Sequence, residues 1–152
     1  MIIFLDTGPT GGITNPTPKS EEVKALQLWA KRMEQAGHTL IIPAVVDYEQ
    51  RREHLRRNAT ASIAALDTFL AATPNRYLYL NDSAFKRAAE IWAQLRKDGL
   101  PTADAKALDC DVILAAQVLD LNLQPGTFIV ATSNVGDLAR MVACDIWQNI
   151  AP

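Results

Sequence analysis

Short apolar runs alternate along the chain with longer segments in which apolar residues recur at helical spacing. The first run, Ile2 to Leu5, is closed by Asp6 and then by Gly8 and Pro9, a pattern typical of a buried strand that ends in a turn. Strands that alternate with helices predict a parallel sheet covered on both faces, a three-layer α/β/α fold with four to five strands. The further strand candidates are Thr39 to Ile42, Tyr77 to Leu80, Thr127 to Ala131 and Val142 to Trp147.

The segments between these runs are expected to be helices, because their apolar residues follow a 3.6-residue period. Two stretches lack this pattern: Thr10 to Ser20, rich in Gly, Thr, Asn and Pro, is predicted to be a loop, and Leu100 to Leu108 a loop or short helical turn. The predicted helices are Glu21 to Ala36, Ala44 to Arg57, Ala59 to Ala72, Asp82 or Ser83 to Lys97, Cys110 to Leu121 and Asn134 to Met141.

A chain of 152 residues can bury a sizeable core without disulfides, and no linker divides it, so residues 1–152 are expected to form a single domain. Cys110 and Cys144 lie in apolar segments with no secretory signal ahead of them, which predicts reduced thiols in the cytoplasm. No apolar run approaches the roughly 20 residues of a membrane span. The formal net charge of -2 gives no basic excess, so a nucleic-acid partner would need a local basic patch.

Two acidic residues fall near the strand ends where such folds bind ligands. Asp6 follows the most apolar strand, although an Asp before a turn has an equally ordinary structural role. Glu49 lies four residues after Val45 and therefore shares the apolar face of its helix, where a carboxylate is costly unless a positive group meets it. The structural alternative for Glu49 is an ion pair with Arg52 or Arg56.

Three more aspartates lie within eight residues, and a fourth follows the fourth strand. Asp109 suits the N-cap of the helix that begins at Cys110, and capping is the favoured interpretation. Asp111 precedes Leu114 and Ala115 by three and four residues, which points it toward the buried face and favours function. Asp137 fits a site or a first-turn position equally well. Asp104 has no assigned role.

Several carboxylates at close range cannot all stay ionised without a cation. An oxygen-only cluster suits Mg²⁺ or Mn²⁺, which bind a few carboxylates together with water and substrate phosphate. Zinc and a histidine-dependent catalytic triad are disfavoured, because His38 and His54 are the only histidines and no zinc-binding spacing occurs.

Four blocks of sequence resemble the PIN-domain ribonucleases, and within them the VapC-type toxins of toxin/antitoxin pairs. Their order and spacing carry the resemblance over nearly the whole chain, and the third block is the most specific. The blocks are Leu5-Asp6-Thr7, Glu49 in the second long helix, Asp111-Val-Ile-Leu-Ala-Ala-Gln117, and Val130-Ala-Thr-Ser-Asn134-Val-Gly-Asp137.

The resemblance implies a PIN-like fold and a metal-dependent endoribonuclease in which Asp6 and Asp111 bind Mg²⁺ and Glu49 completes the ligand set or orients the attacking water. Asn134 or Asp137 would supply a fourth polar group, with Thr132 and Asp109 as possible accessory residues. Leu138 stands where the family usually has Phe. The resemblance also implies an RNA substrate, a cognate antitoxin and a homodimer.

A local basic patch directly follows Glu49, with four arginines inside seven positions. Arg51 and Arg52 are the candidates for RNA phosphate contacts, because they lie next to the proposed metal site. The structural alternative is a solvated helix face balanced by Glu53.

Two other functions stay open. A haloacid-dehalogenase-like phosphohydrolase also has an Asp after its first strand and a Thr or Ser after a later one, as Thr132 would be, but it needs a second Asp where Gly8 stands. The other is a non-catalytic PIN module that binds RNA or protein. Nucleotide-binding glycine motifs are absent, because Gly8, Gly11 and Gly12 fit neither known pattern.

Overall fold

The computed structural model describes residues 1–152 and contains a parallel sheet with the strand order β3-β2-β1-β4-β5. Ile2 in β1 is paired with Thr39 in β2 and with Phe128 in β4, so the most apolar strand lies at the centre. The predicted α/β fold class is therefore confirmed. The strands are β1 (Ile2–Leu5), β2 (Thr39–Pro43), β3 (Tyr77–Leu78), β4 (Phe128–Thr132) and β5 (Cys144–Ile146).

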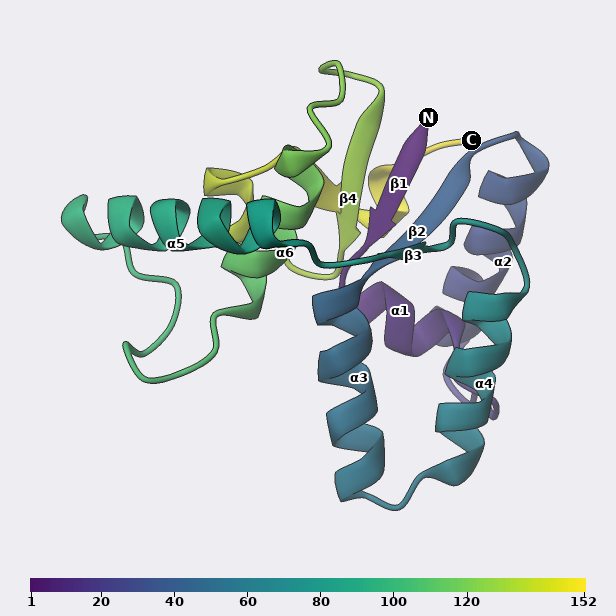
Figure 1. Cartoon of the computed structure of the whole chain (residues 1–152). Helices are drawn as coiled ribbons and strands as arrows, with labels where there is room; N and C mark the ends of the chain where they lie inside the picture. Colours follow the sequence, from purple (N-terminus) through teal and green to yellow (C-terminus); the bar gives the residue numbers. More distant parts are fainter.

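Helices lie on both sides of this sheet, and the chain enters α1 and α3 at the carboxyl ends of β1 and β2 (Figure 1). The hairpin of α3 and α4 extends away from the sheet, whereas α5 packs along α6. None of the helices combines the length and apolar character of a membrane-spanning segment. The helices are α1 (Thr7–Ile13), α2 (Glu21–Gln35), α3 (Ala44–Arg56), α4 (Thr60–Ala71), α5 (Asp82–Lys97) and α6 (Cys110–Asp120), with short 3₁₀ turns η1 (Leu138–Arg140) and η2 (Trp147–Asn149).

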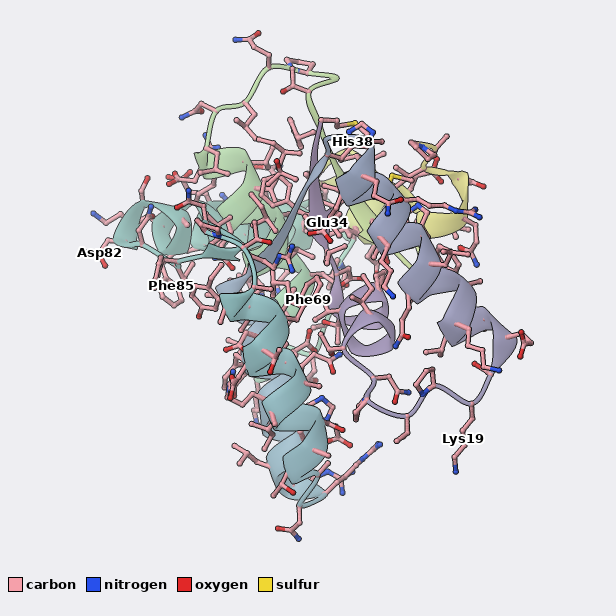
Figure 2. The ribbon with its side chains drawn as sticks, turned by 90° about the vertical axis from the view of Figure 1, so that its right-hand side faces the viewer. Lys19, Glu34, His38, Phe69, Asp82 and Phe85 are labelled. Carbon is pink, nitrogen blue, oxygen red and sulfur yellow. The ribbon has the colours of Figure 1, made fainter.

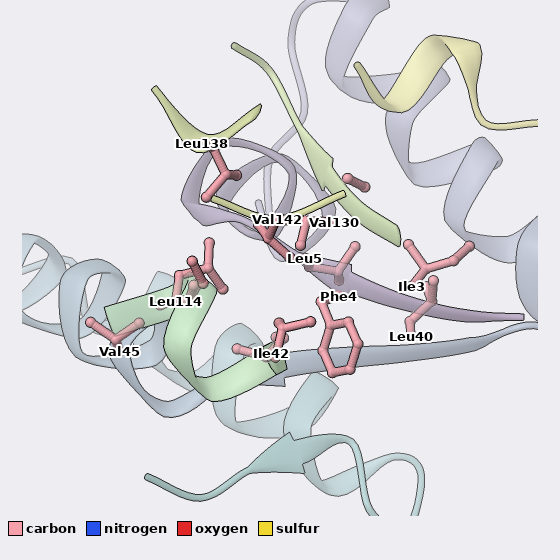
Figure 3. Close-up of a cluster of buried hydrophobic side chains, with 14 of the residues drawn as sticks. Ile3, Phe4, Leu5, Leu40, Ile42, Val45, Leu114, Val130, Leu138 and Val142 are labelled. Carbon is pink, nitrogen blue, oxygen red and sulfur yellow. The ribbon is translucent and has the colours of Figure 1, made fainter. Parts of the chain in front are cut away.

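The core forms on both faces of β1, because successive side chains of a strand point to opposite faces. Ile3, Phe4 and Leu5 are all fully buried, with Phe4 on the opposite face from its two neighbours (Figure 3). The Phe4 ring meets Phe128 of the paired strand edge to face, with ring centroids 6.3 Å apart. β1 is thus held by packing from both layers, and this fixes the position of Asp6, which directly follows the strand.

A buried arginine joins α2 to the end of α4. Arg76 is only 3% exposed; its guanidinium lies over the Phe69 ring at 4.0 Å, donates to the Phe69 carbonyl and pairs with Glu34. Figure 2 shows Glu34 and Phe69 on neighbouring elements. Burial of this charge is tolerated because it is paired and hydrogen-bonded.

The loop predicted from Thr10 to Ser20 is wrong in its first part, because α1 spans Thr7–Ile13. The Asp6 carboxylate accepts a hydrogen bond from the Thr7 amide and so caps this helix. Pro9 is the third residue of the helix, where its missing N–H has no intrahelical partner to lose. A composition rich in Gly and Pro therefore predicts a loop here where the chain forms a short helix.

The glycines of α1 serve close packing. A Cβ at Gly12 would lie 2.4 Å from Leu26 Cδ2 of α2, and one at Gly8 would lie 2.5 Å from Ser133 Oγ, just beyond β4. The small residues thus let α1 approach both neighbours, which keeps the segment after Asp6 tight against the end of β4.

The helix predicted from Asn134 to Met141 is also wrong for most of its length, because only Leu138–Arg140 forms a 3₁₀ turn. The Asn134 amide donates to Thr132 Oγ1 at 3.0 Å, which favours a turn at this point. Two smaller differences occur: α5 is capped by the Asn81 side chain, and the third strand ends at Leu78.

The N-terminus of α3 is capped by a residue from another element. Pro43 gives no side-chain cap; instead Gln117 Oε1 of α6 accepts from the Val45 amide at 3.2 Å. Gln117 Nε2 donates to the Leu78 carbonyl at 3.0 Å, and the side chain is 2% exposed. Gln117 therefore connects α6, β3 and the start of α3.

We expect Gln117→Leu to lower the free energy of unfolding by about 1–3 kcal/mol, because it leaves the Val45 amide and the Leu78 carbonyl without partners at nearly constant volume. Urea denaturation measures this change. The matched control is Gln35→Leu, at an exposed position at the end of α2. Equal stabilities of the two variants would contradict a bridging role for Gln117.

Candidate active site

Asp6 is held from two sides at the carboxyl end of the sheet. One carboxylate oxygen accepts from the Thr7 amide at 2.6 Å, and the other accepts from Thr132 Oγ1 at 2.7 Å. Thr132 is the last residue of β4 and is 1% exposed, and its hydroxyl oxygen in turn accepts the Asn134 amide at 3.0 Å. Two adjacent strands therefore fix the orientation of the Asp6 carboxylate.

Glu49 is joined to Asp6 through Thr7. Thr7 Oγ1 donates to Glu49 Oε2 at 2.6 Å, and Gln50 Nε2 donates to the Thr7 carbonyl at 2.7 Å. Arg52 contacts the other Glu49 oxygen at 3.5 Å. The side chain of Glu49 is 25% exposed, so it lies half-buried between the end of β1 and its own helix.

Asp111 in the first turn of α6 is the residue on which the acidic groups converge. Burial, which is the largest cause, and four nearby carboxylates together raise the pKa of Asp111 from 3.8 to about 6; these carboxylates are Asp6, Asp109, Glu49 and Asp137. Four different parts of the chain thus bring negative charge to one half-buried carboxyl group, as a shared site requires.

Asp109 has a structural role, as expected from its position. Its side chain accepts from the Val112 amide at 3.3 Å and from the Thr102 hydroxyl, and it is 8% exposed. It caps α6 and so orients Asp111. Asp104 lies outside the cluster: its carboxylate accepts the Lys106 amide in an exposed loop turn.

Asp137 lies at the rim and forms an ion pair with Arg140 at 2.7 Å. Asn134 contributes its backbone, while its side chain stays within the turn at Gly136. Of the two candidates for the fourth polar group, Asp137 is the one that contributes to the raised pKa of Asp111. Its carboxylate is also paired with Arg140.

Thr7, Gln50 and Cys110 complete the surroundings of the acidic cluster, and their roles do not follow from the sequence pattern. A Thr directly after Asp6 is the one sequence signal that could have identified its link to Glu49. Burial and, to a smaller extent, the nearby Glu49 together raise the pKa of the Cys110 thiol to about 12. Cys110 therefore stays protonated and acts as a neutral wall of the site.

The basic patch on α3 is largely paired within the chain. Arg51 pairs with Asp47 at 2.8 Å and with Asp67 at 2.7 Å, and these carboxylates raise the pKa of Arg51. Arg52 has one ion pair, the 3.5 Å contact to Glu49, and its guanidinium also lies over the Tyr48 ring. The two remaining arginines of the patch, Arg56 and Arg57, both pair with Glu53, as the alternative of a balanced helix face predicts.

No group of three or more His, Cys, Asp or Glu side chains is arranged so that it could hold a metal ion by itself. The donors near Asp111 are all carboxylate oxygens, which are the ligands of Mg²⁺ and Mn²⁺. Mg²⁺ keeps several waters and needs only one or two carboxylates from the protein. Asp6 and Asp111 therefore have the donor chemistry that such an ion would need.

No protein-family model matches the sequence, and no curated protein matches it either. Solved structures share its fold over nearly the whole chain. VapBC-1 from nontypeable Haemophilus influenzae is 21% identical with a TM-score of 0.69, over 98% of this chain and 100% of that chain. VapBC2 from Rickettsia felis, bound to a promoter DNA fragment, is 19% identical with a TM-score of 0.68, over 97% and 99%. FitAcB from Neisseria gonorrhoeae is 18% identical with a TM-score of 0.66, over 97% and 99%.

The fold is that of the VapBC structures. This agrees with the resemblance drawn from the sequence and confirms the PIN-like three-layer architecture at the level of fold.

The raised pKa of Asp111 makes the metal-free protein sensitive to pH. The folded state holds this proton more tightly than the unfolded state, so stability falls as the pH rises from about 4 through about 6. We expect Asp111→Asn to melt at a higher temperature than the wild type at about pH 7.5 in chelator, and the difference to vanish near pH 4. Differential scanning calorimetry measures both.

The control for this experiment is Glu22→Gln, which removes an exposed first-turn carboxylate from α2, away from the acidic cluster. It should not raise the melting temperature at either pH. A destabilised Asp111→Asn at neutral pH would contradict carboxylate repulsion at this site.

Proposed function

We propose that this protein is a metal-dependent endoribonuclease that cleaves RNA phosphodiester bonds with an activated water. The observation that carries the proposal is the convergence of carboxylates from four parts of the chain on Asp111, at the carboxyl ends of adjacent parallel strands. Like charges at this range call for a cation, and an all-oxygen site beside a phosphodiester suits Mg²⁺ or Mn²⁺.

In this proposal Asp6 and Asp111 hold the metal ion. When bound, the ion lowers the pKa of water and offsets negative charge on the phosphoryl group. Thr132 and Thr7 orient the Asp6 carboxylate through their two hydrogen bonds. Glu49 completes the ligand set or accepts a proton from the attacking water, with its free oxygen lone pairs directed by Thr7. Asp137 adds charge at the rim.

We further propose that the protein is the toxin of a toxin/antitoxin pair and acts as a homodimer with a cognate antitoxin as its partner. The support is the shared fold with the VapBC structures, one of them bound to a DNA fragment from its own promoter. A small neighbouring gene for a DNA-binding protein would support this assignment independently.

Asp6→Asn and Asp111→Asn should each reduce Mg²⁺-dependent cleavage of single-stranded RNA at least about 100-fold, because each removes one ionised oxygen ligand at constant size. Cleavage of a labelled RNA is followed on gels, with and without chelator.

Wild-type protein should also melt at a higher temperature in millimolar Mg²⁺ or Mn²⁺, since the ion binds only the folded state.

The control is Asp104→Asn, which removes a carboxylate of the same region that lies outside the cluster. It should retain wild-type activity. Full activity of wild-type protein in excess chelator would refute the metal-dependent mechanism, and a stable, metal-binding protein without any nuclease activity would indicate the non-catalytic module instead.

Arg51 and Arg52 were both predicted to contact RNA, and their different pairing favours Arg52. Arg52→Gln should weaken RNA binding and reduce the slope of log K against log salt by about 0.7, the value for one phosphate contact on a single strand. Arg51→Gln should leave the slope unchanged, because Arg51 is already neutralised by Asp47 and Asp67. Fluorescence anisotropy over a salt series measures both slopes. Equal salt slopes for Arg52→Gln and Arg51→Gln would contradict a specific role of Arg52 in phosphate contact.

A further inference from the structure

An apolar groove of about 280 Å³ is lined by Tyr48, the residue before Glu49 in the sequence. Its walls come from the N-terminal half of α3, from the first turn of α5, from α6, and from the segments that precede α5 and α6. Figure 2 shows Phe85, one of its walls, projecting near the N-terminal end of α5 beside Asp82. The larger side chains that line it are Tyr48, Leu80, Phe85, Leu108 and Ile113.

Tyr48 connects this groove to the acidic site. It directly precedes Glu49 on α3, and its ring is half exposed, at 49%. The Arg52 guanidinium lies over the ring, 5.1 Å from its centroid, and the same guanidinium contacts Glu49 at 3.5 Å. A single arginine thus touches both the aromatic wall of the groove and a carboxylate of the proposed metal site.

We propose that this groove binds a nucleobase of single-stranded RNA adjacent to the cleaved phosphate, with the base stacked on Tyr48 and Arg52 directed at the phosphate. The proposal rests on the proposed nuclease function and identifies its substrate as an unpaired strand. Stacking on aromatic side chains is how proteins hold single-stranded RNA, and it requires a base that is not paired.

The charges favour RNA over an apolar segment of protein as the occupant. The groove is apolar along its walls, and the arginine at its edge has only one long ion pair, so its charge is available to a phosphate. An aromatic ring beside an arginine suits a nucleotide, whose base is a flat apolar surface and whose phosphate is an anion. A purely apolar partner would leave the Arg52 charge unused.

Two substitutions at Tyr48 test the proposal. In an Asp111→Asn background, which keeps the RNA uncut, Tyr48→Ala should weaken binding of a short single-stranded RNA by roughly 5- to 150-fold, the range for loss of one stacked base. Tyr48→Phe should bind like the parent protein, because it keeps the ring. The matched control is Tyr79→Ala, which removes a more exposed aromatic side chain that does not line the groove.

An abasic scan of the RNA distinguishes stacking from a general loss of affinity. One nucleotide should be sensitive to base removal in the parent protein and become insensitive in Tyr48→Ala, because the two changes delete the same contact. An effect that is additive at every position would overturn the proposal. So would unchanged RNA affinity of Tyr48→Ala combined with dissociation of a dimer in light scattering, which would assign the groove to a second copy of the chain.

Failure of the base-binding groove can be distinguished from failure of the proposed nuclease function. If the wild type cleaves RNA and Tyr48→Ala cleaves it with the same kcat/KM, the nuclease function stands and the base-binding groove fails. If the wild type neither binds nor cleaves single-stranded RNA, both fail.

Discussion

The pairing of β1 with β4 is the constraint on which the rest of the site depends. The register places Leu5 opposite Ala131, so that Asp6 and Thr132 both emerge at the same edge of the sheet and share a hydrogen bond of 2.7 Å. Because both strands are held by buried side chains on either face, this hydrogen bond cannot shift without repacking the core. The orientation of the Asp6 carboxylate is therefore determined by packing rather than by the loop that follows it.

Repulsion within the acidic cluster lowers the stability of the fold that brings these carboxylates together. Capping of α6 by Asp109 and burial of the first turn bring Asp111 close to other carboxylates, and the cost appears as a pKa of about 6. A protein selected for stability alone would place a neutral side chain at this position. The structure retains the charge where its neighbours penalise it, which is the pattern of a functional site.

The sequence predicted those parts of the structure that depend on local periodicity. The strands, the long helices, and the places of Asp6, Glu49 and Asp111 follow from apolar spacing and from the rule that ligands bind at strand ends. It failed at α1, because glycines needed for contact with Leu26 and Ser133 look the same in sequence as glycines needed for turns. The hydrogen bond between Thr7 and Glu49 spans 42 positions and leaves no periodic signal, so only the fold reveals it.

Helix α3 contributes both to the apolar groove, through Tyr48, and to the acidic cluster, through Glu49. Gln117 caps α3 from α6, so the helix that carries Glu49 is positioned by the helix that carries Asp111. Tyr48 is the neighbour of Glu49 on that capped helix, and the groove that it lines is closed on its other side by Ile113 of α6. A base in the groove and a phosphate at the carboxylates would therefore be held by the same pair of elements. The distance between them would depend on the packing of α3 on α6.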